Sequence, residues 1–463
     1  MQNYLIKNIS IVNEGRIFNS DLLIRDGRIE KIGNSLSTPS AVSEINGEGL
    51  HLLPGCIDDQ VHFREPGLTH KADIHSESRA AVAGGVTSFM EMPNTLPPAF
   101  TQELLEEKYL IGERTSLANY SFYMGTSNTN AEEVLKTNAK KNEICGIKIF
   151  MGSSTGNLLV DDFGTLNQLF RGCELLIATH CEDEQIIRRN LQAFRSAGRE
   201  LTAADHPLIR SEEACYTSSR AAAELAKKYN SRLHIFHLST EEELELFTNT
   251  VPLEQKRITA EVCVHHLHFT ADDYPRLGNL IKCNPAIKAA RHRDALWKAL
   301  LDDRLDLIAT DHAPHTLQEK GYFRNPAGRL EKIAGPAGAY LEAHAGLPLV
   351  QHPLLIMLHY VKSGRISLEK IVEKMSHAVA ACFQIRDRGF IREGYFADLV
   401  MVDLQASSDI HAGNILYKCG WSPLEGMHLP ASIVNTFVNG HKVYGNGVFD
   451  ESQKGKRLTF QRQ

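Results

Sequence analysis

The sequence lacks several features that would point to other classes of protein. No uninterrupted apolar run reaches about 18 residues, so no segment is expected to span a membrane. The 9 cysteines include no Cys-x-x-Cys pair, which argues against a secreted disulfide scaffold and favours buried thiols over metal ligands. Positive charge is not in excess, because 50 Lys and Arg face 56 Asp and Glu, and a net charge of -6 gives no basic surface for nucleic acid. The first residues carry no signal segment, so a cytoplasmic protein is expected.

The two ends of the chain are predicted to form one small β-domain. With 463 residues, of which 43% are hydrophobic, the chain can form one large domain and an appendage. Residues 1–52 hold short strand-like runs around Asp26-Gly27, and residues 386–463 hold similar runs around Asn439-Gly440. Both dipeptides favour tight hairpin turns. We therefore expect the ends to pair as a β-sandwich.

Residues 53–385 alternate short apolar runs with amphipathic helical stretches. This alternation is typical of βαβ units with a parallel sheet. The candidate strands are residues 52–57, 87–90, 120–124, 146–151, 175–179, 233–236, 259–264 and 307–310. Eight such units predict a (β/α)8 barrel, although an open doubly wound sheet would show the same periodicity.

Conspicuous polar residues lie at the C-terminal ends of the candidate strands, and one of them, Lys148, lies inside its strand. They are His62, Asn94, Lys148, His180, His237 and Asp311. The carboxyl ends of the strands of a barrel meet at one mouth, where such enzymes carry their active sites. Imidazole and carboxylate groups suit zinc or a similar divalent ion. The pattern therefore predicts a metal centre at the mouth of the barrel.

These motifs resemble those of the dihydroorotases, which belong to the amidohydrolase superfamily, over almost the whole chain. The first motif is Asp58-Asp59-Gln60-Val61-His62-Phe63-Arg64-Glu65-Pro66-Gly67. The later ones are Gly146-Ile147-Lys148-Ile149-Phe150-Met151, Ala178-Thr179-His180, Phe236-His237-Leu238-Ser239-Thr240 and Thr310-Asp311-His312-Ala313-Pro314-His315. The resemblance implies one or two zinc ions bound by His62, Lys148, His180, His237 and Asp311. It further implies a carbamate on Lys148 and a proton-transferring role for Asp311.

The resemblance also implies how the substrate is held. Arg64 offers a planar fork for a carboxylate, with Asn94 and His315 as further contacts. Asn284 corresponds to the position that binds the ring amide, and Pro336 and Gly338 would offer backbone contacts. The implied reaction is the reversible cyclisation of N-carbamoyl-L-aspartate to L-dihydroorotate in pyrimidine biosynthesis. A homodimer is common in the family. The segment from Ser153 to Asn157 is either a lid or a plain flexible loop.

Gln60 departs from the family pattern, because the family usually has its first histidine there. An amide oxygen is a weaker ligand for zinc than imidazole, so the metal site shared by His62 and Asp311 should be loosened. The enzyme would then use one metal ion, or bind a second one weakly through Gln60 or Asp58. Two other interpretations remain open: an inactive scaffold of the same fold, and a cyclic amidase that resembles hydantoinase, dihydropyrimidinase or allantoinase.

Overall fold

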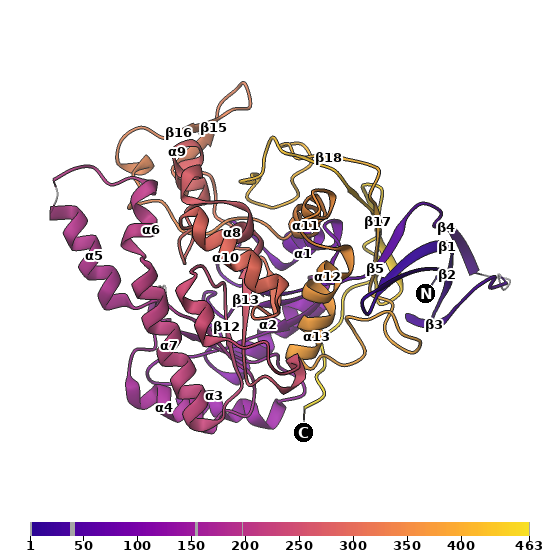
Figure 1. Cartoon of the computed structure of the whole chain (residues 1–463), viewed down its shortest axis with the longest axis horizontal. Helices are drawn as coiled ribbons and strands as arrows, with labels where there is room; N and C mark the ends of the chain where they lie inside the picture. Colours follow the sequence, from indigo (N-terminus) through magenta and orange to yellow (C-terminus); the bar gives the residue numbers. More distant parts are fainter. Residues whose placement is uncertain (1, 38–41, 153–155, 197, 463) are drawn as a thin grey trace.

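A computed structural model describes residues 2–37, 42–152, 156–196 and 198–462. A barrel surrounded by helices forms the larger part of the molecule, and a strand-rich lobe that contains the N-terminal strands lies beside it (Figure 1). Within the described residues, no helix is long and apolar enough to cross a bilayer.

Both ends of the chain contribute to one mixed β-sheet. Its order is β22-β21-β20-β17-β5-β1-β2-β3, with β4 also paired to β1. The strands are β1 (Asn3–Asn13), β2 (Arg16–Arg25), β3 (Arg28–Gly33), β4 (Val42–Asn46), β5 (His51–Pro54), β17 (Leu399–Asp403), β20 (Ser432–Val438), β21 (His441–Gly445) and β22 (Val448–Phe449). The antiparallel pair β5 and β17 joins the two ends, with Leu52 opposite Met401. The expected pairing of the two ends is confirmed.

The predicted hairpin turns have the backbone conformation that their sequences favour. Asp26 and Gly27 have φ of 50° and 81°, and Asn439 and Gly440 have φ of 50° and 75°. Asn, Asp and Gly adopt positive φ more readily than other residues, and such turns match the twist of paired strands. Each dipeptide therefore ends one strand and begins the next.

The central part of the chain forms the predicted barrel. Its strands are β6 (Cys56–Val61), β7 (Val86–Glu91), β8 (Asn119–Phe122) with β9 (Met124–Gly125), β10 (Ile147–Phe150), β11 (Ile177–His180), β12 (Leu233–Ile235), β13 (Ile258–Cys263) and β14 (Leu307–Ala309). Neighbouring strands pair in parallel. A bridge between Val61 and His312 closes the ring, and the His62 amide donates to the His312 carbonyl at 2.7 Å. The parallel sheet is therefore a closed barrel and not an open one.

The first predicted barrel strand, residues 52–57, is two strands in the structure. β5 belongs to the sheet formed by the chain ends, and β6 begins the barrel after Gly55. A Cβ atom at Gly55 would lie 2.1 Å from the Oγ1 atom of Thr87 in β7, so glycine lets the chain pass close to β7 at this point. The predicted domain limits at residues 52 and 385 stay a prediction. In the structure, the chain passes from the sheet of the chain ends to the barrel at Gly55.

The last residues of the chain return to the barrel. The Leu458 amide donates to the Tyr120 carbonyl at 2.8 Å, and Phe460 is fully buried. Leu458 and Phe460 pack in one cluster with Ile57 and Tyr123, which are barrel residues. The predicted C-terminal segment 386–463 therefore contributes to both parts of the fold.

Helices cover the outside of the barrel. The longer ones are α1 (Ile74–Ala83), α2 (Gln102–Thr115), α4 (Phe163–Gly172), α5 (Glu184–Ser196), α7 (Glu212–Tyr229), α10 (Ala290–Leu301) and α11 (Pro353–Lys362). Shorter elements are α3 (Ala131–Leu135), α6 (His206–Ile209), α8 (Val264–His268), α9 (Tyr274–Leu277), α12 (Leu368–Val372), α13 (Ala378–Phe383), β15 (Tyr322–Arg324), β16 (Leu330–Lys332), β18 (Ser408–Asp409) and β19 (His428–Leu429). Ser211 caps α7 by accepting a hydrogen bond from the Ala214 amide, as expected for a serine at a helix start.

Candidate active site

A cavity of about 860 Å³ opens at the carboxyl ends of the barrel strands. The predicted site residues in its wall are Gln60, His62, Arg64, Asn94, Lys148, His180, His237, Asn284, Asp311 and His315. Although these residues are far apart in the sequence, the barrel brings them together. The placement of their side chains agrees with the prediction, while their roles stay a prediction.

Two pairs of potential ligands face each other in this cavity. His62 Nε2 lies 3.1 Å from Asp311 Oδ1, and its Nδ1 lies 2.8 Å from Asn94 Oδ1. His180 Nδ1 lies 2.9 Å from His237 Nε2. Burial lowers the pKa of His62, His180 and His237, so all three imidazoles favour the neutral form that binds metals.

Lys148 is a buried lysine that has no ion-pair partner among the described residues. Only 1% of its surface is exposed, and its Nζ has no hydrogen bond within the described part of the chain. The Nζ lies 4.2 Å from the centre of the Phe236 ring and 4.6 Å from that of Phe150. Burial lowers the pKa of Lys148 to about 7, against the opposing attraction of Asp311. Its amine is therefore far more often neutral than that of an exposed lysine.

A carboxylate orients one of the histidines. Glu182 Oε2 lies 2.9 Å from His180 Nε2 and 2.6 Å from a guanidinium nitrogen of Arg210. Burial alone would raise the pKa of Glu182, but Arg210 and His180 hold this pKa well below its usual range. The ionised Glu182 therefore accepts a hydrogen bond from the Nε2–H group of His180, which leaves the Nδ1 lone pair directed at the cavity.

Three cavity residues have an uncommon backbone conformation. Arg64, His237 and Asp311 have φ of 69°, 39° and 46°. Residues other than glycine rarely adopt positive φ, and such strain is found most often at functional sites. Arg64 lies three residues after the end of β6, and His237 and Asp311 each lie two residues after the ends of β12 and β14, at the mouth of the barrel.

One side of the cavity carries buried positive charge. Arg64 donates through Nε to the Pro314 carbonyl at 3.2 Å, and its Nη2 lies 3.2 Å from His315 Nε2. Lys71, which the sequence did not single out, lies 3.2 Å from His315 Nδ1 and 2.9 Å from Glu319 Oε1. Burial lowers the pKa of Arg64 only to about 10, so the guanidinium stays charged at neutral pH.

Gln60 lies in the cavity wall, whereas Asp58 is not among the described residues that line it. The Gln60 side chain is buried, and its Oε1 lies 3.6 Å from Cys263 Sγ. Asp58 accepts hydrogen bonds from the Thr310 hydroxyl at 2.6 Å and the Thr310 amide at 3.2 Å. Burial raises the pKa of Asp58 to about 8. Its contacts instead hold the strand end next to Asp311.

Other predicted contacts lie elsewhere. Pro336 and Gly338 belong to a short 3-10 helix, Pro336–Gly338, that is not part of the cavity wall as the described residues define it. The wall is formed instead by residues 341–346. Of the predicted lid or loop, Ser153, Ser154 and Thr155 lie outside the described residues.

A buried cluster inside the barrel was missed. His234 Nε2 lies 3.2 Å from Glu261 Oε2 and 3.4 Å from Asp59 Oδ2, and all three residues are fully buried. Burial alone would lower the pKa of His234, but the contacts with Asp59 and Glu261 raise this pKa well above its usual value. Successive side chains of a strand point to opposite faces, and this alternation could have indicated that these three side chains point into the barrel.

The residues of the cavity fit a divalent transition metal ion. Lys148 Nζ and His237 Nδ1 are buried polar atoms without a hydrogen bond to any described residue. His62 faces an amide oxygen with one ring nitrogen and a carboxylate oxygen with the other, so a neutral ring can donate to only one of them. A cation near Asp311 would satisfy the second nitrogen.

Comparison with known proteins agrees with this geometry. The profile of the amidohydrolase family matches residues 51–443. A dihydroorotase from Ligilactobacillus salivarius is 31% identical over 449 residues, which are 95% of this chain and 98% of that protein. An allantoinase from Solibacter usitatus is 30% identical over 99% of this chain and 97% of its own length. The structure of an L-hydantoinase from Arthrobacter aurescens superimposes with a TM-score of 0.90 at 26% identity, over 99% of this chain and 100% of that one.

The chain belongs to the amidohydrolase family. It is an enzyme of the metal-dependent hydrolase class, with the barrel and β-domain that the sequence predicts.

Proposed function

We propose that the protein is a dihydroorotase, which interconverts N-carbamoyl-L-aspartate and L-dihydroorotate in pyrimidine biosynthesis. The observation that carries this proposal is the buried Arg64 beside His315 in the wall of the cavity. Dihydroorotate has a carboxylate that dihydrouracil lacks, and a buried guanidinium without a bound anion is costly. Several relatives of similar identity carry the name dihydroorotase, which supports the same choice.

The cavity residues have separate tasks in this reaction. When bound by Lys148, His180, His237, His62 and Asp311, zinc would supply Lewis acidity to the reacting carbonyl group and acidify water. Asp311 accepts the proton of the attacking water and delivers it to the ring nitrogen that leaves. Arg64 and Asn94 hold the substrate carboxylate, and Asn284 orients the ring amide.

Gln60 determines how firmly a second metal ion would be held. Lys148, His180 and His237 form a complete donor set for one ion, whereas the set at His62 and Asp311 has an amide in place of an imidazole. We infer that the first position fills at lower zinc concentration than the second. Activity with one equivalent of zinc would then be retained.

Arg64 provides the test of substrate choice. Loss of a hydrogen bond to a charged group costs roughly 1.5–3 kcal/mol, so Arg64→Met should raise the KM for dihydroorotate by about 10- to 150-fold. Turnover of dihydrouracil, which lacks the carboxylate, should change little. Arg188→Met is the matched control, because Arg188 also lines the cavity but its side chain is 71% exposed.

The decisive assay uses the purified, metal-analysed protein with dihydroorotate, dihydrouracil and allantoin. Turnover of dihydroorotate alone supports the proposal. Preference for dihydrouracil or allantoin would place the activity with the hydantoinase or allantoinase that the chain also resembles. No turnover with any divalent metal would indicate an inactive scaffold.

A further inference from the structure

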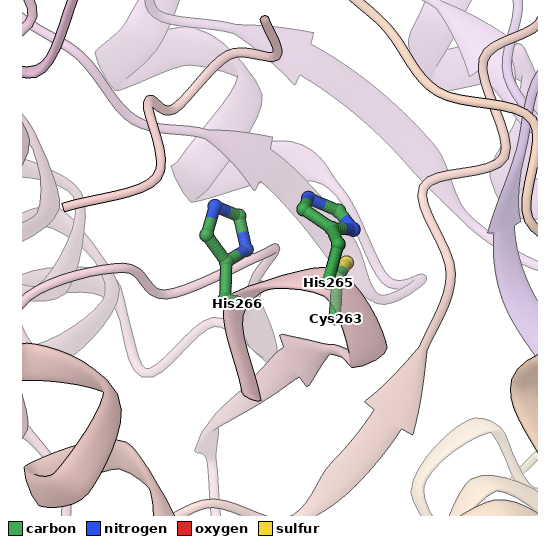
Figure 2. Close-up of side chains that lie close together, drawn as sticks. All are labelled: Cys263, His265 and His266. Carbon is green, nitrogen blue, oxygen red and sulfur yellow. The ribbon is translucent and has the colours of Figure 1, made fainter. Parts of the chain in front are cut away.

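A second group of metal-binding side chains lies where β13 ends and α8 begins. Cys263, His265 and His266 offer ligand atoms that all lie within 4.8 Å of one another. Figure 2 shows the His265 ring close to the Cys263 sulfur and the His266 ring beside it. The centres of the two imidazole rings are 4.2 Å apart. None of the three residues is in the cavity wall as it is formed by the described residues.

These side chains are buried with little hydrogen bonding. Cys263, His265 and His266 are 0%, 1% and 4% exposed. Neither ring nitrogen of His265 has a hydrogen bond of good geometry to a described residue, although the Thr310 backbone lies close enough to act on its charge. His266 Nε2 lies 3.1 Å from the Pro285 carbonyl, and its Nδ1 has no partner in the described ranges. Buried nitrogens of this kind are rare in native structures and call for a missing partner.

The protonation of the group is compatible with metal binding. Burial raises the pKa of Cys263 well above its usual value, and the nearby Glu261 and Asp311 raise it further. A bound ion would displace the thiol proton, because a coordinating thiol is deprotonated. Burial and the neighbouring His266 lower the pKa of His265 well below its usual value, so its imidazole is neutral and able to ligate.

We propose that Cys263, His265 and His266 bind a zinc-type divalent ion at a site separate from the centre in the cavity. Thiolate sulfur and imidazole nitrogen are both ligand types that zinc takes in proteins. The amide oxygen of Gln60, 3.6 Å from Cys263 Sγ, lies beside this set as a further oxygen donor. Gln60 is then a neighbour of both sites, which gives a physical reason for an amide at a position where an imidazole would hold the second ion of the cavity more tightly. This site is independent of which cyclic amide the enzyme opens.

Cobalt substitution tests the sulfur ligand directly, without reference to activity. A cobalt ion bound to a thiolate shows a charge-transfer band in the near ultraviolet, and a site with only nitrogen and oxygen ligands does not. We expect this band in the cobalt-loaded wild-type protein and its loss in Cys263→Ser. The band should persist in Cys145→Ser, which alters another fully buried thiol. His265→Gln and His266→Gln should each lower the cobalt bound per chain by about one equivalent.

A further variant separates the two sites. His237→Asn should lower the cobalt content while leaving the thiolate band in place. Loss of the band in this variant would assign Cys263 to the cavity centre and overturn the proposal. Absence of the band from the wild-type protein, or its persistence in Cys263→Ser, would overturn it as well.

X-ray absorption at the zinc edge needs no variant and so does not depend on whether Cys263→Ser folds. The proposal expects a sulfur neighbour at about 2.3 Å from part of the bound zinc in the wild-type protein. A spectrum with nitrogen and oxygen neighbours alone would contradict it.

Discussion

The low pKa of Lys148 makes a quantitative prediction about carbamate formation. Carbon dioxide reacts with a neutral amine: the nitrogen forms a bond to carbon, and the amine loses a proton to give the anionic carbamate. With a pKa of about 7, the neutral fraction of Lys148 is about 9% at pH 6, about 50% at pH 7 and about 91% at pH 8. An exposed lysine would be only about 0.3% neutral at pH 8.

The assay follows carboxylation of the metal-free protein at a fixed concentration of dissolved carbon dioxide. The initial rate of appearance of the carbamate, measured by carbon-13 NMR with labelled carbon dioxide, should rise about tenfold from pH 6 to pH 8 and then level off. Protonation of the Lys148 amine removes the reactive neutral form, so the rate of carboxylation falls as the pH drops through 7. Lys148→Met should abolish the signal, whereas Lys136→Met, at a position whose side chain is 65% exposed, should not.

One result would refute this reasoning. A rate that continues to rise about tenfold for each pH unit up to pH 9 would show that the reacting amine has the pKa of an exposed lysine. The burial of Lys148 would then not lower its pKa as its surroundings indicate.

Three further outcomes are expected. Gln60→His should raise the affinity for a second zinc equivalent, because imidazole is the better ligand; unchanged stoichiometry and affinity in a zinc titration would place Gln60 away from that site. Glu182→Gln should weaken zinc binding by roughly 10- to 100-fold in competition with a chelator, because it removes the carboxylate that orients His180, whereas Glu184→Gln should not. Ring closure consumes a proton, so the equilibrium ratio of dihydroorotate to N-carbamoyl-aspartate should fall by about tenfold per pH unit between about pH 6 and 8; a constant ratio would rule out this reaction.

Many residues of the cavity could be predicted because they lie in, or shortly after, apolar strands that the sequence shows. Lys148 and His180 each lie within a short buried strand, and Asp311 comes two residues after another. The parallel order of a barrel brings such strand ends together, whatever their separation in sequence. A periodic pattern and the type of residue at each strand end were therefore enough to predict which side chains meet.

The features that the sequence did not predict depend on tertiary packing, which a pattern of apolar and polar residues does not reveal. Gly55, which packs closely against Thr87, lies between two strands, and the apolar run itself shows no such break. Lys71 reaches His315 across 244 residues of sequence between two loops. Pro336 and Gly338 lie in a long connection after the last strand, whose path no periodicity determines.

The seam of the barrel has a consequence for the time at which the enzyme can become functional during its synthesis. His62 and Asp311, which face each other across the closure of the first and last strands, are 249 residues apart in the chain. At a translation rate of about 5–20 residues per second, roughly 12–50 s pass between the synthesis of the first and of the second. Once His237 has been added, the nascent chain carries His62, Lys148, His180 and His237 but not yet the residues that close the ring. Metal uptake into the complete centre is therefore a late event, which follows the emergence of the last barrel strand from the ribosome.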